Sequence, residues 1–236
     1  MSQSPTYKNP EFDEFADNYD QALEKGIAIS GEPKEYFAQG RVNWLANRFT
    51  QMSFQPQRAL DFGCGTGTAT PFLLKLRGLG HLTGLEVSAR SLEVARKFHV
   101  SDRVQFRLCN EFVPAANVDF AFCNGVFHHI PLAERAKAAR YIFDSLRPGG
   151  VFALWENNPW NPGTRYIMSR IPFDREAIML SPRESARMLT DAGFQVLHTD
   201  FLFFFPRMLR IMRGLEELFH AVPLGAQYLV LAQRKV

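Results

Sequence analysis

The sequence predicts an α/β protein built on a doubly wound, mostly parallel sheet with helices on both faces. Strand-like apolar segments alternate with helical segments from residue 58 onward, an order typical of strand–helix units around a parallel sheet. A glycine-rich turn joins the first of these strands to the helix that follows. The chain has 236 residues, 46% of them hydrophobic and 22% charged, which excludes a disordered or fibrous protein.

The first 57 residues are expected to form a helical cap, and residues 58–236 the sheet domain. Ser88 is expected to cap the helix after the second strand, and Ser181-Pro182 to open the helix before the sixth. The helices of the cap are expected around Phe12, Phe15, Ala16 and Tyr19, and from about 33 to 49. Later helices are expected after the glycine turn to about 77, and over 88–98, 131–146 and 181–192. The expected strands are 58–62, 81–87, 104–109, 118–124, 151–155, 194–205 and 227–233.

The net charge and the hydropathy pattern argue against several classes of protein. Lys and Arg number 27 against 24 Asp and Glu, and a formal charge of +3 is too weak to indicate nucleic-acid binding. No apolar run approaches the roughly 18 residues that a membrane span needs, and the N-terminus lacks the apolar core of a signal peptide. The three cysteines, Cys64, Cys109 and Cys123, show no CxxC spacing and are expected to be buried free thiols. These features predict a cytoplasmic protein.

The sharpest motif is the glycine turn that follows the first strand, Asp61-Phe62-Gly63-Cys64-Gly65-Thr66-Gly67. Glycines allow a sharp turn and let a ligand approach the backbone without Cβ atoms in the way. The N–H groups at the start of the next helix then face that ligand. A dinucleotide-binding turn needs G-x-G-x-x-G, but its third glycine would fall on Thr68 or Thr70. The spacing therefore disfavours a nicotinamide-dependent oxidoreductase.

The pattern D-x-G-x-G-x-G resembles motif I of class I S-adenosylmethionine-dependent methyltransferases. The segment Val126-Phe127-His128-His129-Ile130 resembles a later motif of ubiquinone-biosynthesis-type and other small-molecule members of that family. The resemblance runs from about Asp61 to the C-terminus. It implies a seven-stranded Rossmann-like sheet with an antiparallel last strand, a helical N-terminal cap, and S-adenosylmethionine as the cofactor.

The resemblance also implies cofactor-binding residues at the ends of the strands. Glu86, followed by Val87, matches the acid that accepts hydrogen bonds from the two ribose hydroxyls, although a surface acid at a strand end is the alternative. Asn110 and Glu111 fall where the family places a residue near the adenine amine, and either can instead be a simple loop residue. The backbone around Cys123 and Asn124 would face the methionine part of the cofactor. The remaining implied contacts are Asp61, Gly63, Cys64, Gly65 and Gly67.

Two residues of the cap match places where related enzymes cover the cofactor. Arg41 would pair with the methionine carboxylate, and Tyr19 would border the sulfonium through its ring face. A surface arginine and a core tyrosine are the alternatives.

Methyl transfer mainly requires that the two partners be held aligned and dry, and a hydroxyl acceptor also needs a base. Ligands of open α/β sheets bind at the carboxyl ends of the strands, where His128, His129 and Glu156 lie. One of these three is expected to be the base, while packing and helix capping are the alternatives for the histidines. No cluster with the spacing of metal ligands is apparent, so no metal is expected.

The acceptor is expected to bind at two insertions, 157–180 and 207–224, that interrupt the alternation. Residues 157–213 hold eight arginines, no lysine and five acids, a balance that suits a carboxylate or phosphate unless these arginines are simply solvated. Residues 207–220 are amphipathic and would contact a membrane surface, their own domain or a second subunit. The expected acceptor contacts are Trp160, Arg165, Tyr166 and Arg170.

Together these features predict an enzyme that transfers a methyl group from S-adenosylmethionine to a small organic acceptor at oxygen, with an anionic acceptor as one alternative. The alternatives are the same fold acting on a tRNA or protein, which the small net charge disfavours, and a non-catalytic cofactor-binding partner protein. Nucleic acid and a membrane span are not expected.

Overall fold

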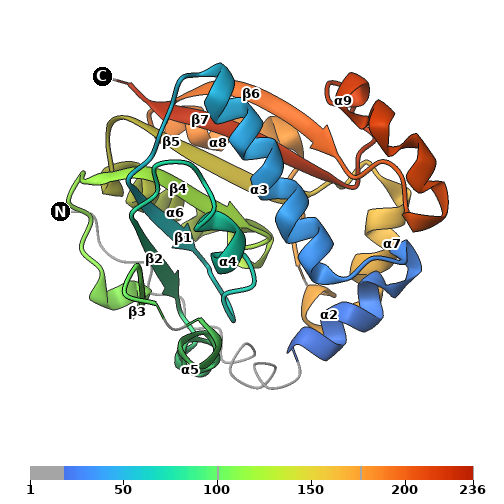
Figure 1. Ribbon diagram of the computed structural model, residues 1–236, viewed down its shortest axis with the longest axis horizontal. Coiled ribbons are helices and arrows are strands. Elements are labelled where there is room, and N and C mark those ends of the chain that lie inside the picture. The colour runs from blue at the N-terminus through green and yellow to red at the C-terminus, as the bar shows by residue number, and fades with distance from the viewer. Residues whose placement is uncertain (1–18, 100, 176, 236) are drawn as a thin grey trace.

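The structure is a computed structural model that describes residues 19–99, 101–175 and 177–235, with the backbone alone at 19–22. These residues form a seven-stranded sheet in the order β3-β2-β1-β4-β5-β7-β6 (Figure 1). Phe12, Phe15 and Ala16, and the side chain of Tyr19, lie outside the described part of the chain. The strands are β1 (Arg58–Phe62), β2 (His81–Glu86), β3 (Val104–Leu108), β4 (Val118–Asn124), β5 (Leu146–Asn157), β6 (Phe194–Leu202) and β7 (Gln227–Arg234).

Strand directions agree with the predicted fold. The pairs β1–β2, β1–β4, β2–β3 and β4–β5 are parallel. β7 inserts between β5 and β6 and runs antiparallel to both. This confirms the expected Rossmann-like sheet with an antiparallel last strand.

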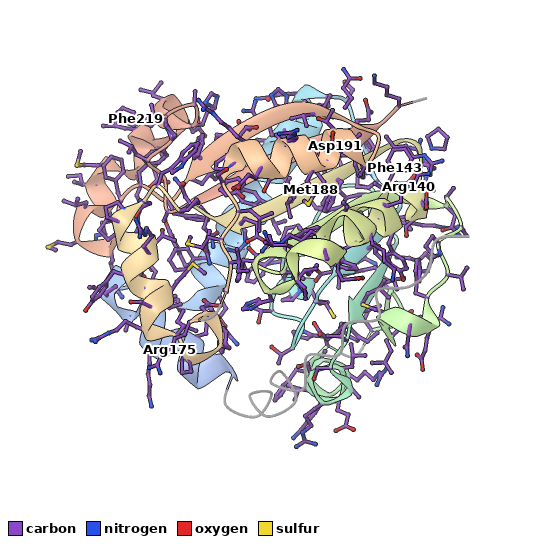
Figure 2. The ribbon with its side chains drawn as sticks, turned by 180° about the vertical axis from the view of Figure 1, so that it is seen from behind. Arg140, Phe143, Arg175, Met188, Asp191 and Phe219 are labelled. Carbon is purple, nitrogen blue, oxygen red and sulfur yellow. The ribbon has the colours of Figure 1, made fainter. Side chains whose placement is uncertain are left out.

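Helices cover both faces of the sheet, as the alternating side chains of its strands require. Phe120 and Phe122 of β4 pack on the side of α3 (Lys34–Gln51) and α4 (Thr70–Leu73). Ala121 and Cys123, one position along, pack on the side of α6 (Leu132–Ser145) and α8 (Pro182–Asp191). Figure 2 shows this second face, with Arg140 and Phe143 on α6 and Met188 and Asp191 on α8. α5 (Ala89–Phe98) packs at the β2–β3 edge.

The two predicted helix starts are confirmed by their caps. The Ser88 hydroxyl accepts a hydrogen bond from the Ser91 N–H. Ser181 forms a reciprocal capping box with Glu184, and Pro182 occupies the first turn of α8.

A buried ion pair ties the cap helix α3 to the far edge of the sheet. Arg48 donates to both carboxylate oxygens of Asp200 on β6, at 2.9 Å from Nε and 2.6 Å from Nη2. The indole N–H of Trp44 donates to the same carboxylate at 2.7 Å. α3 is therefore held over the sheet by a bidentate contact as well as by apolar packing.

Several expected boundaries were wrong for local backbone reasons. The strand expected to reach residue 205 ends at Leu202 because Phe203 takes a left-handed φ of 62°. The helix expected to reach residue 77 is α-helical only to Leu73 and continues in tighter turns, such as Leu76 N–H to Leu73 carbonyl.

The 157–180 insertion contains α7 (Pro162–Arg170) and the 3-10 turn η4 (Pro172–Asp174).

The second insertion is less regular than an amphipathic helix. It forms a 3-10 segment, η5 (Arg207–Leu215), with a kink at Leu209, and then the short α9 (Glu216–Phe219). Met208 and Ile211 are 88% and 91% exposed, so these two apolar side chains do not pack on the domain. Among the described helices, none is long and apolar enough to cross a membrane.

Candidate active site

The site lies where the order of the sheet reverses, at the carboxyl ends of the neighbouring strands β1 and β4. β2 and β3 lie on one side of β1 in the sheet, and the chain then crosses over so that β4 pairs with the other side of β1. Connections on either side of such a point leave the sheet in opposite directions, which opens a crevice there. The glycine turn after β1 and Asn124-Gly125 after β4 border this crevice.

The glycine turn takes a shape that only glycine adopts without strain. Gly63, Gly65 and Gly67 have φ of +74°, +53° and +83°. A Cβ at Gly63 would lie 2.3 Å from the Val126 side chain, so a close approach of two loops also requires glycine there. A Cβ at Gly65 would meet nothing within 4 Å, which leaves open space beside the backbone for a ligand.

Glu86, at the end of β2, is 8% exposed and accepts a hydrogen bond from the glycine turn. Its Oε2 accepts a hydrogen bond from the Gly65 N–H at 3.0 Å. Its Oε1 accepts from the N–H groups of Val87 at 2.7 Å and Ser88 at 3.1 Å. These contacts fix the carboxylate beside the turn.

Two polar oxygens at this crevice are buried and have no hydrogen-bond partner among the described residues: Oδ2 of Asp61 and Oδ1 of Asn124. Buried polar atoms are almost always paired in proteins, so these oxygens indicate a ligand that supplies donors. Burial raises the pKa of Asp61 to about 7, with a further rise from Glu86 and an opposing effect of Arg41. Arg41 is itself buried and donates to Gln227 Oε1 at 2.7 Å.

The other residues expected to contact the cofactor differ in how exposed they are. Asn110 and Glu111 are exposed, in the 3-10 turn η2 (Cys109–Glu111) that follows β3. Val87 is half-buried. Cys64, Cys109 and Cys123 are buried free thiols, as expected.

A cavity of about 140 Å³ opens beside Asn124 and Gly125. Its walls join the end of the sheet to the cap and to α7. The apolar wall includes Phe37, Ile167 and Met168, and the charged side chains Lys34 and Arg41 also line it. The remaining lining residues are Leu23, Ile27, His128, Asn157, Thr164, Ile171, Phe173, Asp174, Ala226 and Gln227.

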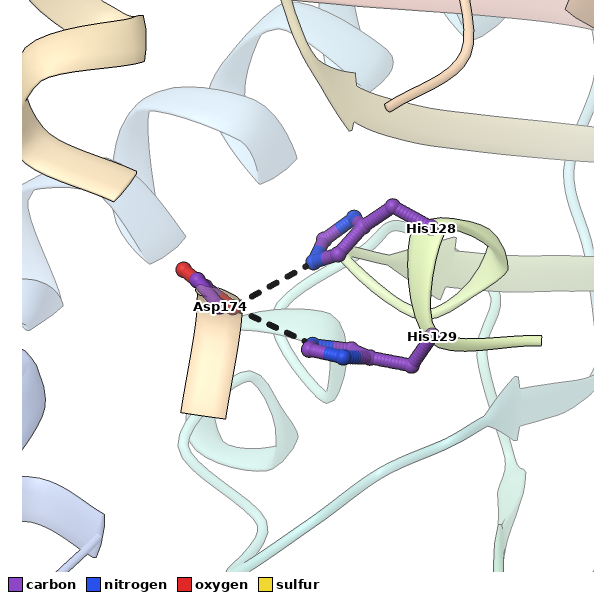
Figure 3. A group of neighbouring side chains, drawn as sticks. All are labelled: His128, His129 and Asp174. Carbon is purple, nitrogen blue, oxygen red and sulfur yellow. Dashed lines mark ion pairs between the residues drawn. The ribbon is translucent and has the colours of Figure 1, made fainter. Parts of the chain in front are cut away.

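The three residues expected to provide a base meet at one edge of this cavity, together with an aspartate that the sequence did not indicate. His128 Nδ1 lies 2.5 Å from Glu156 Oε2. His128 Nε2 lies 3.5 Å and His129 Nε2 3.2 Å from Oδ1 of Asp174, which belongs to η4 (Figure 3). Glu156 is 1% exposed, and its Oε1 accepts from the Phe127 N–H at 2.8 Å.

The charges of this cluster follow from its contacts. Burial lowers the pKa of His128, but the Glu156 and Asp174 carboxylates outweigh it and raise the pKa to about 10. Burial and the neighbouring His128 lower the pKa of His129. Burial of Asp174 opposes ionisation, but hydrogen bonds from both histidines lower its pKa to about 2. Without a ligand, His128 is therefore an imidazolium and His129 a neutral imidazole at neutral pH.

The four side chains expected to contact the acceptor are not brought into the cavity. Trp160 and Tyr166 are 44% and 49% exposed, and Arg165 and Arg170 also face solvent. α7 presents Thr164, Ile167, Met168 and the following Ile171 to the cavity, the face of the helix that the arginines leave free. None of the eight arginines between 157 and 213 lines the cavity, whereas Lys34 and Arg41 of α3 do.

Comparison with known proteins matches part of the chain to a sequence family. Residues 60–152 match the sequence family described as "Methyltransferase domain". Together with the sheet order and the glycine turn, this match supports a class I S-adenosylmethionine-dependent methyltransferase with S-adenosylmethionine as its cofactor.

Curated relatives share this domain over part of their length. Trans-aconitate 2-methyltransferase of Rhizobium rhizogenes is 33% identical over 98 residues, which is 41% of this chain and 37% of the relative. The enzyme of the same name from Rhodopseudomonas palustris is 27% identical over 118 residues, 50% of this chain and 45% of the relative. The chain thus spans less than half the length of these relatives.

Solved structures show the fold over most of the chain. An S-adenosylmethionine-dependent methyltransferase from Archaeoglobus fulgidus has a TM-score of 0.66 at 12% identity, covering 85% of this chain and 95% of that one. One from Mesorhizobium loti has a TM-score of 0.60 at 19% identity, covering 84% and 100%. The [4+2]-cyclase SpnF has a TM-score of 0.65 at 17% identity and covers both chains fully, so the fold alone does not define the reaction.

Proposed function

We propose that this protein transfers a methyl group from S-adenosylmethionine to an oxygen of a small carboxylic acid. The observation that carries the proposal is the cavity itself. It adjoins the end of β4 beside the glycine turn, it is small, and two cationic side chains, Lys34 and Arg41, line it. The similarity to trans-aconitate 2-methyltransferases supports an acid as the acceptor.

The residues at the crevice fit the cofactor. The unpaired Oδ2 of Asp61 and Oδ1 of Asn124 would accept hydrogen bonds from its amino group, and Glu86 would accept them from its ribose hydroxyls. Gly65 leaves the backbone open to the ligand. When bound, S-adenosylmethionine supplies a methyl group activated by a positive sulfur. Arg41 lines the cavity and would pair with the carboxylate of the cofactor.

A carboxylic acid acceptor explains why the histidine cluster does not have to act as a base. Such a group is already ionised at neutral pH and can attack without losing a proton. His128 and Glu156 are bound to each other, and His128 holds its proton tightly. Their role is then to form a fixed edge of the cavity, while Lys34 of α3 pairs with the acceptor.

The proposal is tested by incubating the protein with S-adenosylmethionine carrying a labelled methyl group and a panel of di- and tricarboxylic acids. We expect label in the acid fraction, and we expect Lys34→Met to raise the acceptor KM at least fivefold, because one charged contact is lost. The matched control Lys25→Met alters a lysine of α2 (Tyr19–Ile27) that does not line the cavity. Label transfer to tRNA or protein but to no acid would favour the macromolecular alternative. Tight cofactor binding with no transfer to any acceptor would favour a non-catalytic protein.

A further inference from the structure

We infer that His128, His129 and Asp174 form a binding site for a divalent transition-metal ion, of the zinc or iron type, at the edge of the cavity. Each residue offers one ligand atom, and the three atoms all lie within 4.8 Å of one another. Two imidazole nitrogens and one carboxylate oxygen are the donor set that such ions prefer. Nothing in the glycine turn or the cofactor crevice requires this arrangement.

The spacing of the ligand atoms suits a metal ion. A zinc ion about 2.0–2.1 Å from each ligand, with tetrahedral angles, places neighbouring ligand atoms about 3.3 Å apart. The structure has His129 Nε2 at 3.2 Å and His128 Nε2 at 3.5 Å from Asp174 Oδ1. Figure 3 shows both rings turning this nitrogen toward the same carboxylate. A simple ion pair would require only one of the two rings to do so.

The surroundings of His128 resemble the support that metal-binding histidines receive. Metal-ligating imidazoles usually donate their other N–H to a carboxylate, which fixes the ring and its tautomer. His128 has this contact, from Nδ1 to Glu156 Oε2 at 2.5 Å. Glu156 is in turn fixed by the backbone N–H groups of Val126 and Phe127. His128 therefore presents Nε2, its remaining nitrogen, in a rigid position.

Burial and charge favour a cation at the same place. His128, Glu156 and Asp174 are 4%, 1% and 8% exposed, so two carboxylates lie together away from solvent. A dication bound by the two imidazoles, in exchange for the proton on Nε2 of His128, would compensate both of them.

The location gives the ion a function that rests on the proposed methyl transfer. His128 and Asp174 line the cavity, so the positions left open by three protein ligands would face the acceptor. An oxygen of the acid would occupy one of them. The ion would also join η4 of the 157–180 insertion to the end of β4 and thereby complete the cavity wall.

The test is metal titration of the tag-free protein after removal of metals with a chelator. We expect one Zn²⁺ per chain with micromolar or tighter affinity by calorimetry, and visible absorption bands when Co²⁺ is added. Asp174→Asn and His129→Gln should each weaken Zn²⁺ binding at least tenfold, and Glu156→Gln by about 10- to 100-fold. His81→Gln is the matched control, because this histidine is exposed at the start of β2.

Circular dichroism establishes that each variant is folded, and two independent ligand variants keep the test decisive if one does not fold. Absence of stoichiometric Zn²⁺ binding by the folded wild-type protein would overturn the inference and leave an ion-paired cluster only. Equal affinity in wild type, Asp174→Asn and His129→Gln would place any bound metal elsewhere and overturn it as well. The titration contains neither cofactor nor acceptor, so its failure would leave the proposed methyl transfer standing.

Discussion

Asp61 allows the strongest quantitative prediction, because its burial should make the ligand-free protein less stable as the pH rises. The carboxyl is 2% exposed at the end of β1, with Oδ2 unpaired among the described residues. Its pKa is about 7 in the folded protein against an ordinary value of 3.8. The unfolded chain therefore loses this proton near pH 4, whereas the folded chain keeps it to about pH 7. The free energy of unfolding falls across that interval.

The magnitude follows from the shift. At 1.36 kcal/mol per pKa unit, the difference between 3.8 and about 7 corresponds to at most about 4 kcal/mol. Asp61→Asn keeps the shape of the side chain but removes the ionisation. We expect the stability of the variant relative to wild type to increase by up to about 4 kcal/mol between pH 4 and pH 8.

The assay is denaturant unfolding of both proteins at several pH values, with the difference taken at each pH so that other titrating groups cancel. The same substitution should weaken S-adenosylhomocysteine binding at pH 8, because a neutral amide is a poorer partner for the ligand's ammonium group. A stability difference that does not change with pH, or that changes in favour of wild type at pH 8, would refute the reasoning.

Three further substitutions test separate parts of the account. Glu86→Gln should weaken S-adenosylhomocysteine binding by about 10- to 100-fold in calorimetry, because charge-assisted hydrogen bonds to the ribose are lost. Asp200→Ala should lower the free energy of unfolding by about 3–5 kcal/mol in denaturant titration, because it removes the carboxylate that the largely buried guanidinium of Arg48 binds. Gly63→Ala should cost about 3 kcal/mol in the same assay, since its φ is +74° and the new Cβ would meet Val126 at 2.3 Å.

Each of these substitutions has a matched control. Glu93→Gln changes an exposed acid of α5 and should leave ligand affinity unchanged. Asp144→Ala breaks a surface pair with Arg140 and should cost less than about 1 kcal/mol. Gly214→Ala introduces a Cβ with nothing within 4 Å and should be nearly neutral. If a control variant changes ligand affinity or stability as much as its test variant does, the contact assigned to the test residue is contradicted.

Local sequence signals predicted the sheet and the glycine turn that borders the crevice. The glycine turn, the strand-end acid Glu86 and the caps at Ser88 and Ser181 depend on neighbours a few residues away, and their backbone preferences are strong. The strand boundary at Phe203 was missed because an aromatic residue gives no sign of a left-handed φ.

The cavity could not be predicted in the same way, because it is assembled from segments far apart in the chain. Asp174 approaches His128 only because η4 folds back over the end of β4. Arg41 contacts Gln227 across 186 positions of sequence. The arginines of the 157–213 region suggested a charged mouth, but helical geometry turns Arg165 and Arg170 away from the cavity. No local pattern distinguishes the cavity-facing side of α7 from its solvent side.

The most direct measurement of the central claim is calorimetric titration of the purified protein with S-adenosylhomocysteine and, separately, with NAD. The account predicts one molecule of S-adenosylhomocysteine bound per chain with micromolar affinity, and no heat from NAD. Folded protein that binds NAD but not S-adenosylhomocysteine would contradict it, and with it the assignment of the glycine turn.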